Sequence, residues 1–246
     1  MVQIAFIPFE FPEIPGIGCA FSSRRGGASR LPYHSANLSY DVGDDPDHVD
    51  ENRACLQNRF RLKALVDCTQ VHGDDMRLDA KPGMRCEADG LTTAEPGIGL
   101  MIKTADCQPI LLAHESGKYA AALHAGWRGN KINFPATGVR VFCEHYGLKP
   151  SELLAVRGPS LGPDQAEFQN FEDDFGPGFE PWFNPETRTM NLWELTRHQL
   201  AEAGLAPERI FGLDLCTKSR EEDFFSYRRD KTTGRQAGII WIKSPI

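Results

Sequence analysis

The sequence predicts a single domain of mixed α/β (α+β) structure in which strands and helices do not alternate regularly. Its 246 residues are 41% hydrophobic, which is enough for one sizeable core, and no linker-like stretch divides them. Three strand-like apolar runs follow one another between residues 99 and 123, and the next periodic segment is a helix. This order argues against a regular array of βαβ units. One domain over residues 1–246 is therefore expected.

Three helices are predicted from the residues that begin and end them. In the Asp45-Pro46 pair, the aspartate is a good N-cap and the proline suits the first helical position, so a helix is expected to run to about Phe60. A second helix is expected to stop at Gly147, and a third to follow Asn191. The three predicted helices lie within residues 45–60, 135–146 and 192–203, with Gly204 ending the last one.

Strands are predicted where short apolar runs are bounded by turn residues. The last of them, Gly238–Ile242, is expected to pair with Phe224–Arg228 across a turn at residues 231–235. The other predicted strands are Gly99–Lys103, Ile110–Ala113, Tyr119–Leu123, Leu153–Arg157 and Arg209–Leu213.

Charge and composition exclude several classes of function. The formal net charge is -7, so nonspecific binding to nucleic acids or to anionic membranes is not expected. No stretch reaches the roughly 20 apolar residues of a membrane-spanning helix, and the N-terminus does not read as a signal peptide. Seven cysteines, an odd number without framework spacing, are typical of reduced thiols in a cytoplasm. The sequence thus predicts a cytoplasmic protein.

Three residues, His72, Cys107 and His124, stand where strands are expected to give way to turns. Apolar runs lead into Cys107 and His124, and glycine or small residues lie beside all three. Sites at strand ends are common because a rigid element then positions a flexible loop. Two histidines and a cysteine can bind a transition metal and leave one position open, which is the pattern of catalytic zinc. For any one cysteine, simple packing in the core is the alternative.

These segments resemble the YfiH family, whose members have been called multicopper polyphenol oxidoreductases or laccase-domain proteins. The resemblance extends over nearly the whole chain. Its main segments are FSSR at 21–24, ADGL at 88–91, TADC at 104–107, PIL at 109–111, HAGWRG at 124–129, GPSLG at 158–162 and SYRRD at 226–230. The chain departs from the family at residues 163–168, which read PDQAEF where many members carry a Tyr-Glu-Val-like sequence. This departure puts the base preference in question.

The resemblance implies a fold, a metal and an activity. The implied fold is a single α/β domain with packed mixed sheets flanked by helices, similar to the catalytic domain of cytotoxic necrotizing factor toxins. The implied metal is zinc, bound by His72, Cys107 and His124, with copper as an alternative occupant. The implied activities are phosphorolysis of adenosine, inosine or methylthioadenosine and deamination of adenosine. The implied partners are therefore a purine nucleoside and phosphate.

Phosphorolysis requires an anionic phosphate to be held beside the ribose. Arginine suits this task because its planar guanidinium binds phosphate oxygens in pairs. Arg24 and Arg128, which match family segments, are the candidates for catalysis and substrate binding, whereas Arg25 reads as a surface charge. Asn37 is a candidate for a hydrogen bond to the base or ribose, with capping of a turn as the alternative. Trp127 is expected in the core rather than as a stacking surface.

Deamination requires a proton carrier near the metal. Asp106 is the adjacent carboxylate, but neighbouring strand residues point to opposite faces, so orientation of a histidine suits it at least as well as proton transfer. Asp89 is the other candidate, although a turn before Gly90 is its favoured interpretation. On a strand, Arg228 and Arg229 would lie on opposite faces, so at most one of them is expected to face a shared site.

Other functions compete with this one. A cysteine hydrolase would use Cys107 as nucleophile and His124 as its base. A copper-binding polyphenol oxidoreductase would use the three ligands with Met84 or Met101 as a weak axial ligand. A four-copper laccase needs roughly ten histidines, many in His-x-His pairs; this chain has seven and no such pair, which excludes it. A nucleotide-sensing binding protein and, from the resemblance alone, a peptidoglycan-editing factor are the remaining alternatives.

Overall fold

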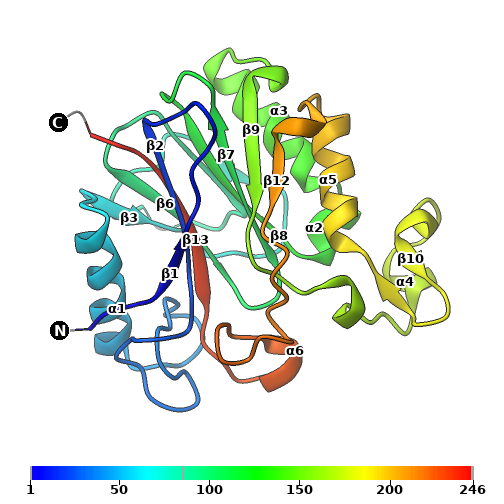
Figure 1. Ribbon diagram of the computed structural model, residues 1–246, viewed down its shortest axis with the longest axis horizontal. Helices are drawn as coiled ribbons and strands as arrows, with labels where there is room; N and C mark the ends of the chain where they lie inside the picture. Colours follow the sequence, from blue (N-terminus) through cyan, green and yellow to red (C-terminus); the bar gives the residue numbers. More distant parts are fainter. Residues whose placement is uncertain (1, 85, 245–246) are drawn as a thin grey trace.

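Two mixed β-sheets form the centre of the structure, a computed structural model that describes residues 2–84 and 86–244 (Figure 1). In spatial order, the first sheet holds β1 (Phe6–Pro8), β2 (Ile17–Ser22), β13 (Gln236–Ile242), β6 (Ile98–Thr104) and β3 (Ala64–Val66). The second sheet holds β12 (Ile210–Gly212), β9 (Leu153–Arg157), β7 (Gln108–His114), β8 (Ala120–Ala125), β5 (Gly90–Thr93) and β4 (Met76–Arg77). A separate hairpin joins β10 (Phe183–Asn184) and β11 (Thr189–Met190).

The α-helices of the described residues are short. They are α1 (Pro46–Arg59), α2 (Trp127–Lys131), α3 (Phe134–Tyr146), α4 (Phe171–Asp174), α5 (Leu192–Glu202) and α6 (Tyr227–Asp230). Single turns of 3-10 helix occur at Pro150–Glu152, Pro163–Gln165, Glu180–Trp182 and Pro207–Arg209. In the part of the chain that the structure covers, no helix has both the length and the apolar character needed to cross a membrane.

The two sheets pack face to face, and helices cover their outer faces. Leu111 of β7 packs between the sheets in the same cluster as Leu100 of β6. Its neighbour Ile110 points the other way and packs with Phe142 of α3, while α1 covers the outer face of the first sheet through Leu56. Figure 1 shows α1 on one side of the sheets and α3 and α5 on the other. Every residue of β6 and β7 is buried for this reason.

All three predicted helices are confirmed, with the expected residues at their ends. The Asp45 carboxylate accepts a hydrogen bond from the backbone N–H of Asp47 at the start of α1. Helix α3 ends at Gly147, whose φ of +67° is a left-handed conformation that glycine adopts without strain. The Asn191 side chain accepts from the N–H of Glu194 at the start of α5. The local capping signals therefore determined where these helices begin and end.

The other predicted strands are also confirmed, but the strand predicted at residues 224–228, and its pairing with Gly238–Ile242, are wrong. Strand β13 does not pair with residues 224–228; it lies between β2 and β6 and is antiparallel to both. The second half of the expected partner forms α6 instead. The Ser226 hydroxyl accepts from the N–H of Arg229, and the Asp106 carboxylate accepts from the N–H of Arg228. Side chains thus satisfy the N–H groups that a strand would have offered to its neighbour.

A lobe rich in phenylalanine, residues 161–192, lies beside the start of α5 (Figure 1). It contains α4 and the β10–β11 hairpin and has its own apolar cluster, in which Phe168, Phe171 and Phe175 pack together. We call it the aromatic lobe. It matters for function because three of its residues also line the pocket that contains the candidate site: Leu161, Phe168 and Leu192.

Candidate metal centre and its pocket

A pocket of about 440 Å³ lies where β6 and β8 end and β7 begins. The residues that line it at these strand ends include Thr104, Cys107, Gln108 and His124. The two sheets face each other here, so residues from both contribute to one cavity. The pocket is thus built at the ends of rigid buried strands, as the sequence predicted for its chemically active residues.

His72, Cys107 and His124 come together in this pocket. One nitrogen of each histidine and the sulfur of the cysteine all lie within 4.8 Å of one another, an arrangement that could hold a metal ion. The Cys107 Sγ is 3.8 Å from the His72 Nε2, and the two imidazole ring centres are 4.8 Å apart. His124 is buried, Cys107 is half-buried and His72 is exposed. The site can therefore be reached from solvent on one side.

The backbone around these three residues is unusual. His72 has a φ of +62° and Asp106, just before Cys107, has a φ of +100°, a region that residues with a side chain rarely occupy. Such conformations persist where the surrounding structure holds them, often at functional sites. Gly126 approaches the site so closely that a Cβ there would lie 2.7 Å from the Cys107 Sγ. Only glycine fits at that position.

Asp89, and not Asp106, orients a histidine of the site. Its carboxylate is fully buried and accepts a hydrogen bond from the His124 Nδ1 at 2.7 Å. The same carboxylate accepts from the backbone N–H groups of Val71, His72 and Gly73. Burial disfavours its charge, but these hydrogen bonds and the charge of His124 outweigh burial and hold the pKa of Asp89 below its ordinary value.

This geometry corrects two interpretations of the sequence. Asp89 directly precedes strand β5, which begins at Gly90, and its carboxylate joins the loop of His72 to the strand of His124, so it does more than form a turn. Asp106 uses both carboxylate oxygens elsewhere: one accepts from the Thr217 hydroxyl and the other from the N–H of Arg228, each at 2.7 Å. Asp106 lines the pocket and ties α6 to its rim.

Cys107 and His124 form a strongly coupled pair in the metal-free site. Burial opposes ionisation of the Cys107 thiol, but the charge and hydrogen bonding of His124, together with His72, lower its pKa to about 6. Burial also disfavours a charged His124, yet Cys107 and Asp89 raise its pKa to about 9. A thiolate beside an imidazolium is therefore favoured near neutral pH. A thiolate is also the form in which cysteine binds a metal.

Four cationic side chains line the same pocket. Lys103 is 7% exposed, and its Nζ pairs with Asp67 at 2.7 Å and with Asp41 at 3.1 Å. Arg235 donates to the carbonyl oxygens of Thr233 and Gly234. Burial lowers the pKa of the Arg235 guanidinium, while the negative charges of Cys107 and Asp106 act in the opposite direction. The other two cations are Arg128 and Arg228.

Sequence reasoning missed Lys103 and Arg235. A signal for Lys103 was present, because a lysine inside a strand that is otherwise apolar is rarely buried without a partner. Arg235 carried no such signal, since its place depends on the Asn37 side chain, which accepts from the Arg235 backbone N–H at 2.9 Å. Asn37 itself is fully buried and also binds Ser39 and Asp44, so it supports the pocket without lining it.

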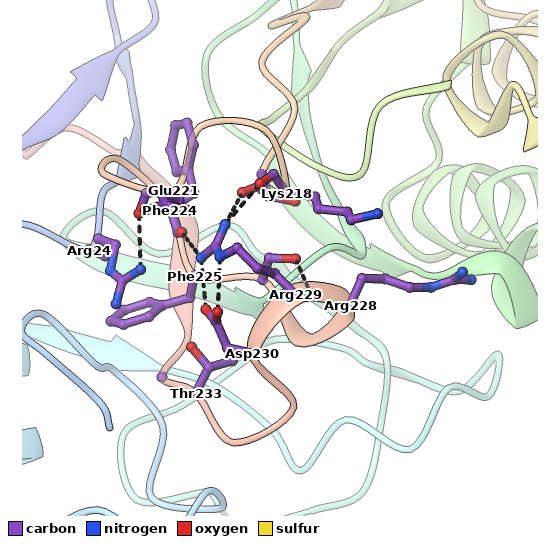
Figure 2. A network of polar contacts seen from close by, with 12 residues as sticks. Arg24, Lys218, Glu221, Phe224, Phe225, Arg228, Arg229, Asp230 and Thr233 are labelled. Atoms are coloured by element: carbon purple, nitrogen blue, oxygen red, sulfur yellow. Dashed lines mark hydrogen bonds and ion pairs between the residues drawn. The ribbon is translucent and has the colours of Figure 1, made fainter. Parts of the chain in front are cut away.

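Arg24 lies outside this pocket. Its guanidinium donates to the carbonyl oxygens of His34 and Glu221 and stacks over the Phe225 ring at 4.8 Å. Figure 2 shows Arg24 and Arg228 on opposite sides of Arg229. Arg25 lies beside it and pairs with two acidic residues on the surface, Glu222 and Asp223. The structure thus does not bring Arg24 together with the three possible metal ligands.

Of the two arginines at α6, only Arg228 lines the pocket. The Arg229 guanidinium is surrounded by acceptors: the carbonyl oxygens of Thr217, Lys218 and Phe224 and the carboxylate of Asp230. Figure 2 shows this network, with Arg228 extending away from it. The prediction that at most one of the pair faces the site is confirmed, although α6 rather than a strand separates the two side chains.

Trp127 is both a packing residue and a pocket residue. Its ring packs against Phe168 and Phe175 of the aromatic lobe, at centroid distances of 5.8 and 5.7 Å. It also lines the pocket, and the Arg128 guanidinium stacks on it at 4.3 Å. Together with Leu161, Phe168 and Leu192, Trp127 gives the pocket an apolar side, which we call the apolar wall.

The chain is similar to known proteins over almost its full length. A curated relative from Escherichia coli, purine nucleoside phosphorylase YfiH, is 37% identical over 243 residues, which cover 95% of this chain and 97% of the relative. Purine nucleoside phosphorylase from Haemophilus influenzae is 34% identical over 232 residues, which cover 90% and 93%. The crystal structure of YlmD from Geobacillus stearothermophilus superposes with a TM-score of 0.84 at 30% identity and covers 95% of this chain and 94% of that one.

The family model described as multi-copper polyphenol oxidoreductase laccase matches residues 18–243, which include all three possible metal ligands. Taken with the full-length relatives, this match shows that the chain belongs to that family, the YfiH family.

Proposed function

We propose that the protein is a metal-dependent purine nucleoside phosphorylase. The observation that carries the proposal is the His72, Cys107 and His124 set in a 440 Å³ pocket that has an apolar wall and several cations. A purine nucleoside has an apolar, stackable base and a polar sugar, so such a pocket suits it. The relatives that share this chain's full length carry the name purine nucleoside phosphorylase, which supports the same substrate class.

Zinc is the metal that we propose for the site. Two imidazole nitrogens and one thiolate are typical ligands of a catalytic zinc, which keeps a fourth position open. The hydrogen bond from His124 to the Asp89 carboxylate also supports a metal at this site, because a histidine that binds a metal usually donates its other ring nitrogen to a carboxylate. When bound, the metal would supply a Lewis acid beside the substrate. Copper could use the same three ligands, which is why metal content has to be measured.

Arg128 is the residue that we propose for binding phosphate. Its side chain is exposed at the pocket, and within residues 2–84 and 86–244 its guanidinium makes no hydrogen bond or ion pair. Free guanidinium donors can bind two phosphate oxygens at once. Arg228 and Arg235 each retain donors beyond those used by backbone carbonyls, so they are suited to assist. Arg24 is left out because its donors are used outside the pocket.

Deamination of adenosine is the second activity that we propose for the site. It needs a carboxylate to carry protons, and two aspartates, Asp41 and Asp106, line the pocket. Both oxygens of Asp106 already accept hydrogen bonds, which makes it a poor proton carrier. Asp41 is largely exposed and pairs with Lys103, so it retains a free oxygen. We therefore assign the proton-carrying role to Asp41 rather than to Asp106.

A cysteine hydrolase is the competing function, and one observation favours it. The low pKa of Cys107 beside a protonated His124 is also the arrangement of a nucleophilic thiolate and its partner. In that case the protein would act without a metal, and a covalent adduct would form on Cys107. The two functions therefore differ in metal content and in the fate of the thiol.

One experiment tests the proposed function. Protein of known metal content is incubated with adenosine or inosine, with and without phosphate, and the products are separated. Release of free base together with ribose 1-phosphate, only when phosphate is present, is the expected result for a phosphorylase. Conversion of adenosine to inosine would demonstrate deamination. Base release that needs no phosphate and survives complete metal removal would instead support the cysteine hydrolase.

A further inference from the structure

The two histidines of the candidate metal site are held in different ways. The His124 ring donates a hydrogen bond to the buried Asp89 carboxylate. The His72 ring is exposed, and the only polar partner that the described residues offer it is the Cys107 Sγ, 3.8 Å from its Nε2. The position of the His72 imidazole therefore depends on the backbone that carries it.

The Gln70 side chain fixes this backbone to the first sheet. Strand β3 pairs with β6 only as far as Val66, opposite Leu100, whereas β6 continues to Thr104. Further along this edge, the Gln70 amide takes the place of a strand partner. Its Nε2 donates to the Lys103 carbonyl at 2.8 Å, and its Oε1 accepts from the Lys103 N–H at 2.9 Å. One side chain thus satisfies both backbone groups of a buried strand residue.

This contact ties His72 to the strand that leads into Cys107. Gln70 is two residues before His72, and Lys103 is four residues before Cys107. From the other side, Asp89, which precedes β5 of the second sheet, accepts from the backbone N–H of His72. The loop that carries His72 is therefore held between the two sheets, by Gln70 on one side and by Asp89 on the other.

The conformation of His72 needs such support. Its φ of +62° lies in the left-handed region, and residues with a side chain keep this conformation where the surrounding structure holds them in it. Apolar packing contributes little here, because the neighbouring Val71 is 47% exposed. The hydrogen bonds of Gln70 and Asp89 are thus the main restraints on this loop.

We propose that Gln70 is a positioning residue for the metal, because its amide holds His72 where it can share one ion with Cys107 and His124. The inference rests on the proposed metal site and adds a residue outside the ligand set on which metal affinity depends. Groups that orient metal ligands typically contribute about 10- to 100-fold to metal affinity. Gln70 acts on the backbone of its ligand rather than on the ring, so a contribution near the lower end, about tenfold, is expected.

The test is a double-mutant cycle on zinc affinity, measured by competition with a chromophoric chelator. Gln70→Met keeps the length of the half-buried side chain and removes both hydrogen bonds. It is expected to weaken zinc binding about tenfold, and Gln70→Leu should act in the same way. In a His72→Ala background, Gln70→Met is expected to have no further effect on zinc affinity, because Gln70 acts through His72.

Gln236→Met is the matched control. The Gln236 amide makes the same pair of hydrogen bonds, accepting from the N–H of Phe225 at 2.7 Å and donating to its carbonyl at 3.1 Å, and Gln236 does not line the pocket. This variant should lower the Tm of the metal-free protein, because it removes two buried hydrogen bonds, and should keep the zinc affinity of the wild type. Thermal unfolding of each metal-free variant shows that it is folded.

Three results would overturn the inference: wild-type zinc affinity in both Gln70 variants, an equal loss caused by Gln70→Met in the His72→Ala background, or an equal loss in Gln236→Met. Either of the last two would mean that loss of structure in general, and not the position of His72, weakens zinc binding. A wild-type protein that binds no zinc would instead contradict the proposed metal site itself, and the inference with it.

Discussion

Arg24 and Arg128 both lie next to small residues in segments that match the family, yet the fold uses them in opposite ways. The Arg24 guanidinium donates to two backbone carbonyls far apart in the sequence and so connects two segments of the chain. The Arg128 guanidinium stacks on a tryptophan at a pocket and makes no hydrogen bond or ion pair with the residues that the structure describes. The difference shows that a motif arginine is available to a ligand only where the fold leaves its donors without acceptors.

The two aspartates beside the site also have different roles. Asp106 is next to Cys107 in sequence, but its carboxylate holds the start of α6. Asp89 is 35 residues from His124 and still holds its imidazole. Proximity in the sequence therefore predicts the role of neither residue. Variants of these arginines and aspartates can test whether each residue supports the metal, the anion or only the fold.

Removal of a metal ligand should have the largest effect. Cys107→Ser replaces a thiolate with a poor zinc ligand, so metal content and activity are expected to fall together, with activity reduced by at least about 100-fold. Elemental analysis and phosphorolysis assays of the same preparation measure both quantities. Full metal occupancy in Cys107→Ser would contradict the proposed ligand set.

The next largest effect is expected for the residue that orients His124. Asp89→Asn keeps the size of the side chain but removes its charge, and metal affinity should fall by about 10- to 100-fold. Competition with a chromophoric chelator measures this affinity. Asp106→Asn is the matched control and should leave metal affinity close to that of the wild type, because Asp106 contacts no ligand imidazole. Equal losses of metal affinity in both variants would contradict the separate role of Asp89 in orienting His124.

The reactivity of Cys107 should depend on both metal and pH. In the metallated protein the thiolate is engaged, so alkylation by iodoacetamide should be slow and should accelerate after chelation. In the metal-free protein the rate should fall as pH drops through the Cys107 pKa of about 6, because the thiolate becomes protonated. The rate at pH 5 is then expected to be about tenfold below that at pH 7. Rapid alkylation of fully metallated protein would favour the cysteine hydrolase.

The smallest effects should separate the two arginines directly. Arg128→Ala is expected to raise the KM for phosphate by about tenfold without changing thermal stability, because it removes an exposed side chain that binds the anion. Arg24→Ala should leave the KM for phosphate unchanged and lower the free energy of unfolding by about 2 kcal/mol, since it removes hydrogen bonds from a charged group. For a chain of this size, this loss corresponds to a Tm lower by about 6 °C.

Steady-state kinetics and thermal unfolding of both variants measure the two effects. A phosphate effect in Arg24→Ala, or a large loss of stability in Arg128→Ala, would reverse the assignment of the two residues. Either result would show that the arrangement of donors in the free protein does not decide which arginine meets the substrate.

Local signals in the sequence determined much of this protein. The caps at Asp45, Gly147 and Asn191 set the ends of three helices, because a capping group acts on backbone groups only a few residues away. Apolar runs predicted the central strands for a similar reason, since side chains on both faces of each strand are buried. The family segments also singled out the three residues that meet as possible metal ligands.

Only the tertiary structure decided what surrounds these ligands. Asp106 and Arg228 are 122 residues apart, and their hydrogen bond turns a predicted strand into helix α6. Asn37 positions the backbone of Arg235 from 198 residues away and thereby places a cation in the pocket. No local pattern encodes such contacts, because each depends on which segments the two packed sheets bring together. The three possible metal ligands could thus be predicted from the sequence, but the residues that surround them required the fold.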